Sequence, residues 1–143
     1  MLKLRKNKKG FTLVELIVVI AIMAVLAGTV AGVTVSQLNK QTNKSAQSEV
    51  DALMNDFKSF MLDYKFENGK TLSDAVSTFA TEADTTKGTT GILTAKGSAL
   101  PKAGEHKFAY EVADNKVTFS CQGKGTNAAV IKAEYTYSDV LGG

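Results

Sequence analysis

The chain has 143 residues, one cysteine and a formal net charge of +3, and this length suits a single domain. Five of its seventeen basic residues lie before Gly10, and from Phe11 onward twelve lysines against fourteen acids leave a net charge of −2. Scattered lysines without arginine exclude the clustered basic surface that nucleic acid requires, and a lone cysteine excludes an intramolecular disulfide.

Residues 11–35 form an apolar run in which Glu15 is the sole charge. A helix of this length can cross the hydrocarbon core of a bilayer. Five cations precede the run and none follows it until Lys40, so the positive-inside rule places residues 1–10 in the cytoplasm. The sequence therefore predicts a single-pass helix with its N-terminus inside and its C-terminal part outside.

Three interpretations of this run stand open. It is a plain membrane anchor, or a secretory signal cleaved near small residues such as Thr29 and Ala31. In the third interpretation, cleavage between Gly10 and Phe11 leaves the apolar run on the mature protein. The first two leave Glu15 without a purpose, although an ionisable group in lipid is costly.

A family resemblance favours the third interpretation. The basic leader, Gly10, the triplet Phe11-Thr12-Leu13 and Glu15, ahead of a long aliphatic helix, resemble the GFxxxE class III signal of type IV pilins and pseudopilins. The resemblance implies that a prepilin peptidase cuts between Gly10 and Phe11 and N-methylates Phe11. It also implies that Glu15 pairs with the α-amine of Phe11 on a neighbouring subunit and sets the axial register of assembly. The alternative is that Glu15 favours the positive end of its own helix dipole, or pairs with its own amine.

Small residues recur every four positions in the second half of the apolar run, namely Ala24, Gly28, Gly32 and Ser36. Such spacing permits close approach of another helix, and simple lipid-facing packing is the alternative. Many pilins carry a proline here, which this chain lacks. Because each glycine costs a helix about 1 kcal/mol relative to alanine, Gly28 and Gly32 are candidates for helix packing or for flexibility.

The helix is predicted to continue from about residue 11 to about residue 67, where Asn68-Gly69 supplies a stop. Its second half carries an apolar stripe at helical spacing, formed by Val50, Leu53, Met54, Phe57, Phe60, Met61 and Tyr64. Thr71 and Asp74 resemble a capping box that starts a short second helix. Residues 84–106 are predicted to be a long connection with one small strand at Ile92 and Leu93.

Residues 108–121 predict a β-hairpin whose two-residue turn is Asp114-Asn115. This register puts all apolar residues on one face, through the pairs Phe108–Cys121, Tyr110–Phe119 and Val112–Val117. Cys121 is thereby predicted to be a core position. A third strand is expected from about Ala128 to Tyr137, with the inward residues Ala129, Ile131, Ala133, Tyr135 and Tyr137.

The predicted fold class is α+β, with a long N-terminal helix packed against a small antiparallel β-sheet of about three strands. Residues 1–10 are the expected cytoplasmic leader, residues 11–35 the transmembrane and filament-core helix, and residues 36–143 a globular head that includes the second half of the helix. The head resembles the type IV pilin head. No nucleophile-and-base pair predicts an enzyme, and lone His106 and Cys121 predict neither metal nor cofactor.

The predicted function is that of a structural subunit, the major pilin of a type IV pilus with adhesion, motility or biofilm roles. Alternatives are the major pseudopilin of a type II secretion system, a competence pilin, or a membrane-anchored binding module. The resemblance implies as partners further copies of the chain, the prepilin peptidase, the inner-membrane assembly machinery and, before assembly, lipid. It implies a location in the cytoplasmic membrane first and in an extracellular pilus afterwards.

Overall fold

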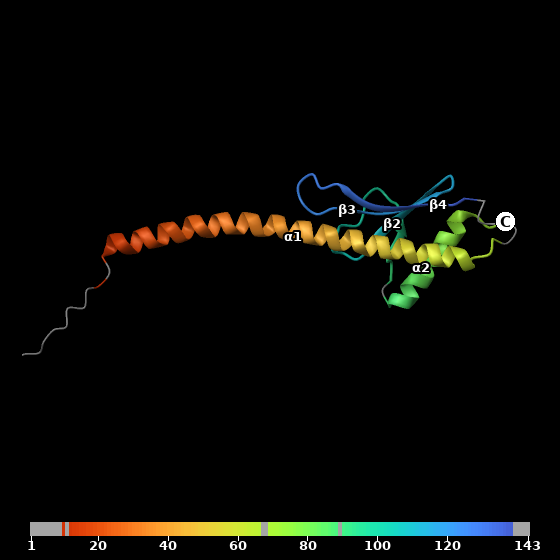
Figure 1. Ribbon diagram of the computed structural model, residues 1–143, viewed down its shortest axis with the longest axis horizontal. Helices are drawn as coiled ribbons and strands as arrows, with labels where there is room; N and C mark the ends of the chain where they lie inside the picture. The colour runs from red at the N-terminus through yellow and green to blue at the C-terminus, as the bar shows by residue number, and fades with distance from the viewer. Residues whose placement is uncertain (1–9, 11, 67–68, 89, 139–143) are drawn as a thin grey trace, which may run out of the picture. The chain divides into compact units, whose positions relative to one another are not determined.

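The computed structural model describes residues 10, 12–66, 69–88 and 90–138, and the chain divides into two compact units, Met1–Gln37 and Leu38–Gly143. The elements are α1 (Leu13–Asp63), α2 (Leu72–Lys87), β1 (Leu93–Ala95), β2 (Phe108–Ala113), β3 (Lys116–Gln122) and β4 (Val130–Thr136). In the second unit, strands β2, β3 and β4 run alongside the second half of α1 (Figure 1). The predicted α+β class is confirmed.

Helix α1 ends at Asp63, about four residues before the predicted end. The Tyr64 N–H still donates to the Phe60 carbonyl at 2.9 Å, but the chain then leaves the helix. The ring of Phe66 packs on Tyr64 and Tyr137, with centroid distances of 5.1 and 5.2 Å. These aromatic contacts compete with continuation of the helix. Asn68, the predicted stop, lies outside the described residues.

The sheet has four strands in the order β1-β2-β3-β4. Strands β2, β3 and β4 pair antiparallel, as predicted, but β1 pairs parallel to β2, so the expectation of an all-antiparallel sheet of about three strands is corrected. Residues 96–107 form a connection long enough for a parallel crossover. The Asp84 carboxylate accepts hydrogen bonds from the N–H groups of Gly91 and Ile92 at 2.8 and 2.9 Å, which hold the chain where it enters β1.

The predicted hairpin register is confirmed for two pairs, Tyr110–Phe119 and Val112–Val117, around the Asp114-Asn115 turn. Phe108 and Cys121 lie one position beyond the paired Ala109 and Ser120, and both are buried. Asp114 adopts a left-handed φ of +53°, which aspartate tolerates in turns.

The inward residues Ile131 and Ala133 of β4 are confirmed, whereas Ala129 is exposed and precedes the strand. The Ala129 carbonyl accepts a hydrogen bond from the Gly123 N–H at 3.2 Å, which turns the chain before β4 begins. This contact requires glycine, because a Cβ on Gly123 would lie 2.5 Å from the same carbonyl oxygen.

Helix α2 begins with the predicted capping box. The Thr71 N–H donates to Asp74 at 2.7 Å and the Asp74 N–H donates to the Thr71 hydroxyl at 3.4 Å, and the first of these bonds lowers the pKa of Asp74. The helix continues to Lys87, so the connection begins at residue 88 and not at residue 84 as predicted. Gly88, with φ +63°, forms the left-handed C-cap.

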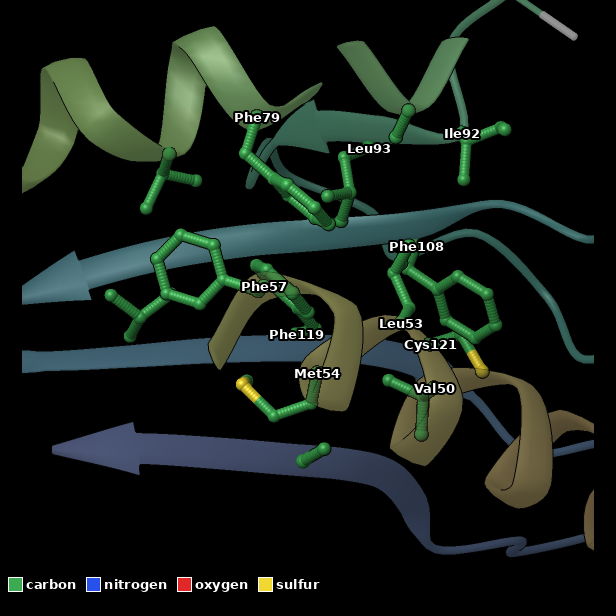
Figure 2. Packing of buried hydrophobic residues seen from close by; sticks show 14 of the residues in the cluster. Val50, Leu53, Met54, Phe57, Phe79, Ile92, Leu93, Phe108, Phe119 and Cys121 are labelled. Carbon is green, nitrogen blue, oxygen red and sulfur yellow. The ribbon is translucent and has the colours of Figure 1, made fainter. Parts of the chain in front are cut away.

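The core lies where α1 and α2 cover one face of the sheet, and Figure 2 shows their side chains meeting those of the strands. The ring of Phe57 contacts Phe79, Phe119 and Tyr135 at centroid distances of 5.2, 5.5 and 5.7 Å. Cys121 is fully buried in the same core, and this burial raises the pKa of its thiol. Its predicted place in the core is confirmed.

Polar side chains of α1 bind backbone groups of the loop between β3 and β4 and of β4 itself. The Asn43 amide donates to the Lys124 carbonyl at 3.0 Å and accepts from the Lys124 N–H at 2.7 Å. One turn further along, Gln47 donates to the Lys132 carbonyl at 3.2 Å. The polar stretch of the helix therefore fixes these backbone groups of the head by direct hydrogen bonds.

Candidate processing and assembly site

Gly10 lies outside α1, which begins at Leu13, and it is exposed. A Cβ built on Gly10 meets no described atom within 4 Å beyond its chain neighbours. The fold of the described residues therefore gives no reason for glycine at this position. Phe11, the predicted new N-terminus, lies outside the described residues.

Glu15 forms a capping box with Thr12 at the start of α1. The Thr12 N–H donates to a carboxylate oxygen of Glu15 at 3.2 Å, and the Glu15 N–H donates to the Thr12 hydroxyl at 3.2 Å. The carboxylate thus lies in the first turn, at the positive end of the helix dipole. The sequence prediction did not include this box, although Thr-x-x-Glu ahead of an apolar run is its signature.

The apolar side chains of α1 in the first unit are exposed. Large apolar side chains from Leu13 to Val35 are 49% to 75% exposed, so the chain by itself does not bury them. By length and composition, the helix that contains them is the one candidate membrane span among the described residues. The hydroxyls of Thr29 and Thr34 donate to the carbonyls of Leu26 and Val30 at 2.9 and 2.8 Å. Both hydroxyl groups therefore have hydrogen-bond partners within the helix.

The stripe of small residues, Ala24, Gly28, Gly32 and Ser36, is exposed on the same helix. A Cβ added to Gly28 or to Gly32 meets no described atom within 4 Å. Neither glycine is therefore required by contacts of the described chain. The surface formed by this stripe of small residues is available for close packing of another helix.

A groove of about 810 Å³ lies between α1 and α2 in the described part of the head. Its lining includes the rings of Phe60, Tyr64 and Phe79 and the carboxylates of Asp56 and Glu82. Elsewhere the His106 ring nitrogen Nδ1 lies 2.8 Å from Glu49, at the surface. Within the described parts of the chain, no group of three His, Cys, Asp or Glu side chains is placed to hold a metal ion.

Comparison with known families identifies the N-terminal segment. Residues 5–31 match the family described as the prokaryotic N-terminal methylation motif. The chain therefore carries the class III signal peptide of a type IV pilin-like prepilin, as the resemblance predicted. Proteins of the pilin type are structural subunits. No curated protein and no solved structure matches the chain.

Proposed function

We propose that the chain is the major pilin of a type IV pilus, which a prepilin peptidase processes between Gly10 and Phe11 and which polymerises through its apolar N-terminal helix. The observation that carries the proposal is the methylation motif at residues 5–31, which opens a helix whose apolar side chains are exposed. Such a surface needs lipid before assembly and other helices after it.

Cleavage changes the charge at the membrane surface. The leader carries five cations, which hold an N-terminus at the anionic cytoplasmic face. Their removal lowers the cost of extracting the helix into a filament. The resemblance to prepilins implies that a residue without a side chain at position 10 lets the backbone enter a narrow cleft of the peptidase, and the fold of the described residues places no competing demand on Gly10.

Glu15 then directs assembly. In the bilayer it lies in the first turn of α1, close enough to the interface to be hydrated. Within a bundle of helices it loses water and needs a counter-ion, which the α-amine of Phe11 on a neighbouring copy supplies. A buried polar pair of this kind selects one axial register at some cost in stability.

The proposal implies a two-stage location and four partners. Before assembly the chain spans the cytoplasmic membrane with its head outside, in contact with lipid, the prepilin peptidase and the inner-membrane assembly machinery. After assembly it lies in an extracellular fibre, in contact with copies of itself. The fibre supports adhesion, motility or biofilm formation.

Mass spectrometry of the mature protein tests processing. The expected N-terminus is methylated Phe11, and Gly10→Leu should leave the precursor uncut because the added side chain blocks the peptidase cleft. A start at Met1, or one after residue 30, would contradict the proposal. Deletion of the chain should then remove long surface fibres. Loss of secretion or of DNA uptake without loss of long fibres would assign it instead to a pseudopilin or a competence pilin.

Glu15→Ala tests assembly separately from processing. The variant should still be cut, since the peptidase acts at Gly10, but the yield of sheared fibres should fall at least tenfold because the intersubunit ion pair is lost. The matched control is Glu82→Ala, which removes an exposed carboxylate from the head. It should leave the fibre yield unchanged. Normal fibres from Glu15→Ala would refute the register role.

A further inference from the structure

Four exposed lysines lie on and beside the part of α1 that follows its apolar run. Two are on the helix itself, one is in the loop between β3 and β4, and one is in the connection between β1 and β2. In this order they are Lys40, Lys44, Lys124 and Lys102. We propose that these four residues, the lysine patch, bind the phosphate head groups of anionic phospholipids at the outer surface of the membrane and hold the head there before assembly. This inference rests on the proposed function, which places the head outside the membrane.

Hydrogen bonds fix Lys124 beside the helix, and in Figure 1 its loop lies next to α1. The Asn43 side chain donates to the Lys124 carbonyl at 3.0 Å and accepts from the Lys124 N–H at 2.7 Å. Lys40 and Lys44 are four residues apart on α1, so they share one face of the helix. Asn43 lies between them in the sequence, so the loop that it binds is held close to both.

The connection between β1 and β2 brings Lys102 to the same end of the head. Lys102 forms a bridge with Gln122 at the end of β3, where the Ala103 N–H also donates to the Gln122 carbonyl at 2.8 Å. Two residues further on, a Cβ built on Gly104 would lie 3.2 Å from the side-chain methyl of Thr42 on α1. The fold therefore gathers at one end of the head lysines that are scattered in the sequence.

The ammonium groups of the lysine patch are available to a ligand. Within the described parts of the chain, none of the four forms an ion pair, whereas three lysines of and beside the sheet pair with glutamates. Two carboxylates at this end of the head already have partners. Glu105 accepts a hydrogen bond from the Lys102 N–H at 3.0 Å, and Glu49 lies 2.8 Å from the His106 ring nitrogen.

The place of the lysine patch in the chain points to a membrane surface. Lys40 and Lys44 are the first charged residues after Glu15, so no other charge separates the apolar run from the head. In the proposed topology the apolar run spans the bilayer, and these two lysines are the charges that follow it on the outer side. Each lysine near an anionic lipid surface strengthens the attraction about fivefold. Four lysines at one end of the head therefore suit anionic head groups.

Three double variants test the lysine patch, and each neutralises two exposed lysines. They are the helix variant Lys40→Gln with Lys44→Gln, the loop variant Lys102→Gln with Lys124→Gln, and the control variant Lys58→Gln with Lys65→Gln. The control removes the same charge from the head outside the patch. Folding of each variant is checked with a thiol reagent, because the fully buried Cys121 reacts only if the head unfolds.

Native mass spectrometry of the processed full chain measures its lipid preference. The chain is mixed in detergent with equal amounts of phosphatidylglycerol, which is anionic, and phosphatidylcholine, which is not. The ratio of the two bound lipids should favour phosphatidylglycerol in the unmodified chain. The helix variant and the loop variant should each lower this ratio at least about fivefold, the effect of losing one lysine at an anionic surface. The control variant should leave it unchanged.

An unchanged ratio in the helix variant or in the loop variant would overturn the inference, and so would an equal fall in the control. Loss of fibres with an unchanged lipid ratio would assign the lysine patch to contacts between copies instead. If the precursor is not cut after Gly10, the proposed function falls, and the lipid ratio is then compared on precursors that all carry the same leader. If the precursor is cut and all ratios are equal, only this inference falls.

Discussion

At Phe57, aromatic side chains from both helices and from the sheet converge. The residue is fully buried, and its ring lies within 6.3 Å of Phe60, Phe79, Phe119 and Tyr135, measured between centroids. The helical spacing of the stripe predicts that Phe57 is buried. Phe60 is a neighbour on the same helix, but Phe79, Phe119 and Tyr135 come from α2, β3 and β4, far along the chain, so no local pattern could identify those three partners.

Phe57→Ala should lower the free energy of unfolding of the head by about 3–5 kcal/mol, because it removes a large buried ring and leaves a cavity. Urea denaturation of residues 38–143, monitored by circular dichroism, measures the change. The control is Leu62→Ala on the same helix, where the side chain is 81% exposed. Its effect should stay within about 0.5 kcal/mol. A loss below about 1 kcal/mol for Phe57→Ala would contradict the packing described.

At the scale of elements, α1 contains two kinds of apolar surface in one continuous helix. The residues from Leu13 to Val35 expose apolar side chains on all sides, as in a membrane span. From Ala46 to Met61 the buried residues follow one stripe, as in a helix that packs on a sheet. The amino-acid composition distinguishes these two parts of α1. The part from Leu13 to Val35 has almost no polar residues, whereas the part from Ala46 to Met61 has a polar face opposite its buried stripe.

Substitutions at Gly28 and Gly32 should show whether these glycines serve close packing between helices or flexibility of α1. We expect the double change to alanine to preserve fibre yield and the double change to leucine to abolish it, because only leucine closes the smooth surface to a neighbouring helix. Alanine also removes the flexibility of glycine, with a gain of up to about 1 kcal/mol of helix stability at each site. Equal loss of fibres in both variants would favour a flexible segment.

The measurement is the fibre yield by shearing and immunoblotting, after processing has been checked by mass spectrometry. Val33→Leu is the control, because it adds one carbon to an exposed side chain of the same helix outside the small-residue stripe. It should assemble normally.

At the scale of the whole molecule, the hydrophobic core belongs entirely to the second unit. All its buried members lie between Ala46 and Ala133, within the unit Leu38–Gly143. Among the described residues, the first unit contributes none of them. The head thus has what an independently folding domain needs.

Residues 38–143 should therefore fold without detergent into a monomer with one cooperative unfolding transition. Sedimentation velocity and urea denaturation measure the two properties. A shorter chain, residues 64–143, should not fold, because it lacks Val50, Leu53 and Phe57 from the core. Aggregation of residues 38–143 under conditions that keep the full chain folded in detergent would contradict this.

Agreement between sequence and structure was best where the pattern was local. The alternation around Asp114-Asn115 predicted the β2–β3 register, and the Thr71 capping box predicted the start of α2. The ends of elements were predicted less well. Helix α1 ends at Asp63, shortly before Phe66 packs on Tyr137, and α2 continues to Lys87. The end of α1 lies at a contact with a distant segment, which periodicity does not encode, whereas the end of α2 lies at the left-handed C-cap Gly88.

The sequence by itself determined the class III signal, the apolar helix and the α+β class, because each is written in a contiguous motif or a regular period. Only the tertiary structure decided that β1 joins the sheet parallel to β2, that Asn43 holds the loop at Lys124, and where α1 ends. These features join residues far apart in the chain. Their free energy comes from hydrogen bonds and ring contacts that exist only once the chain has folded back on itself.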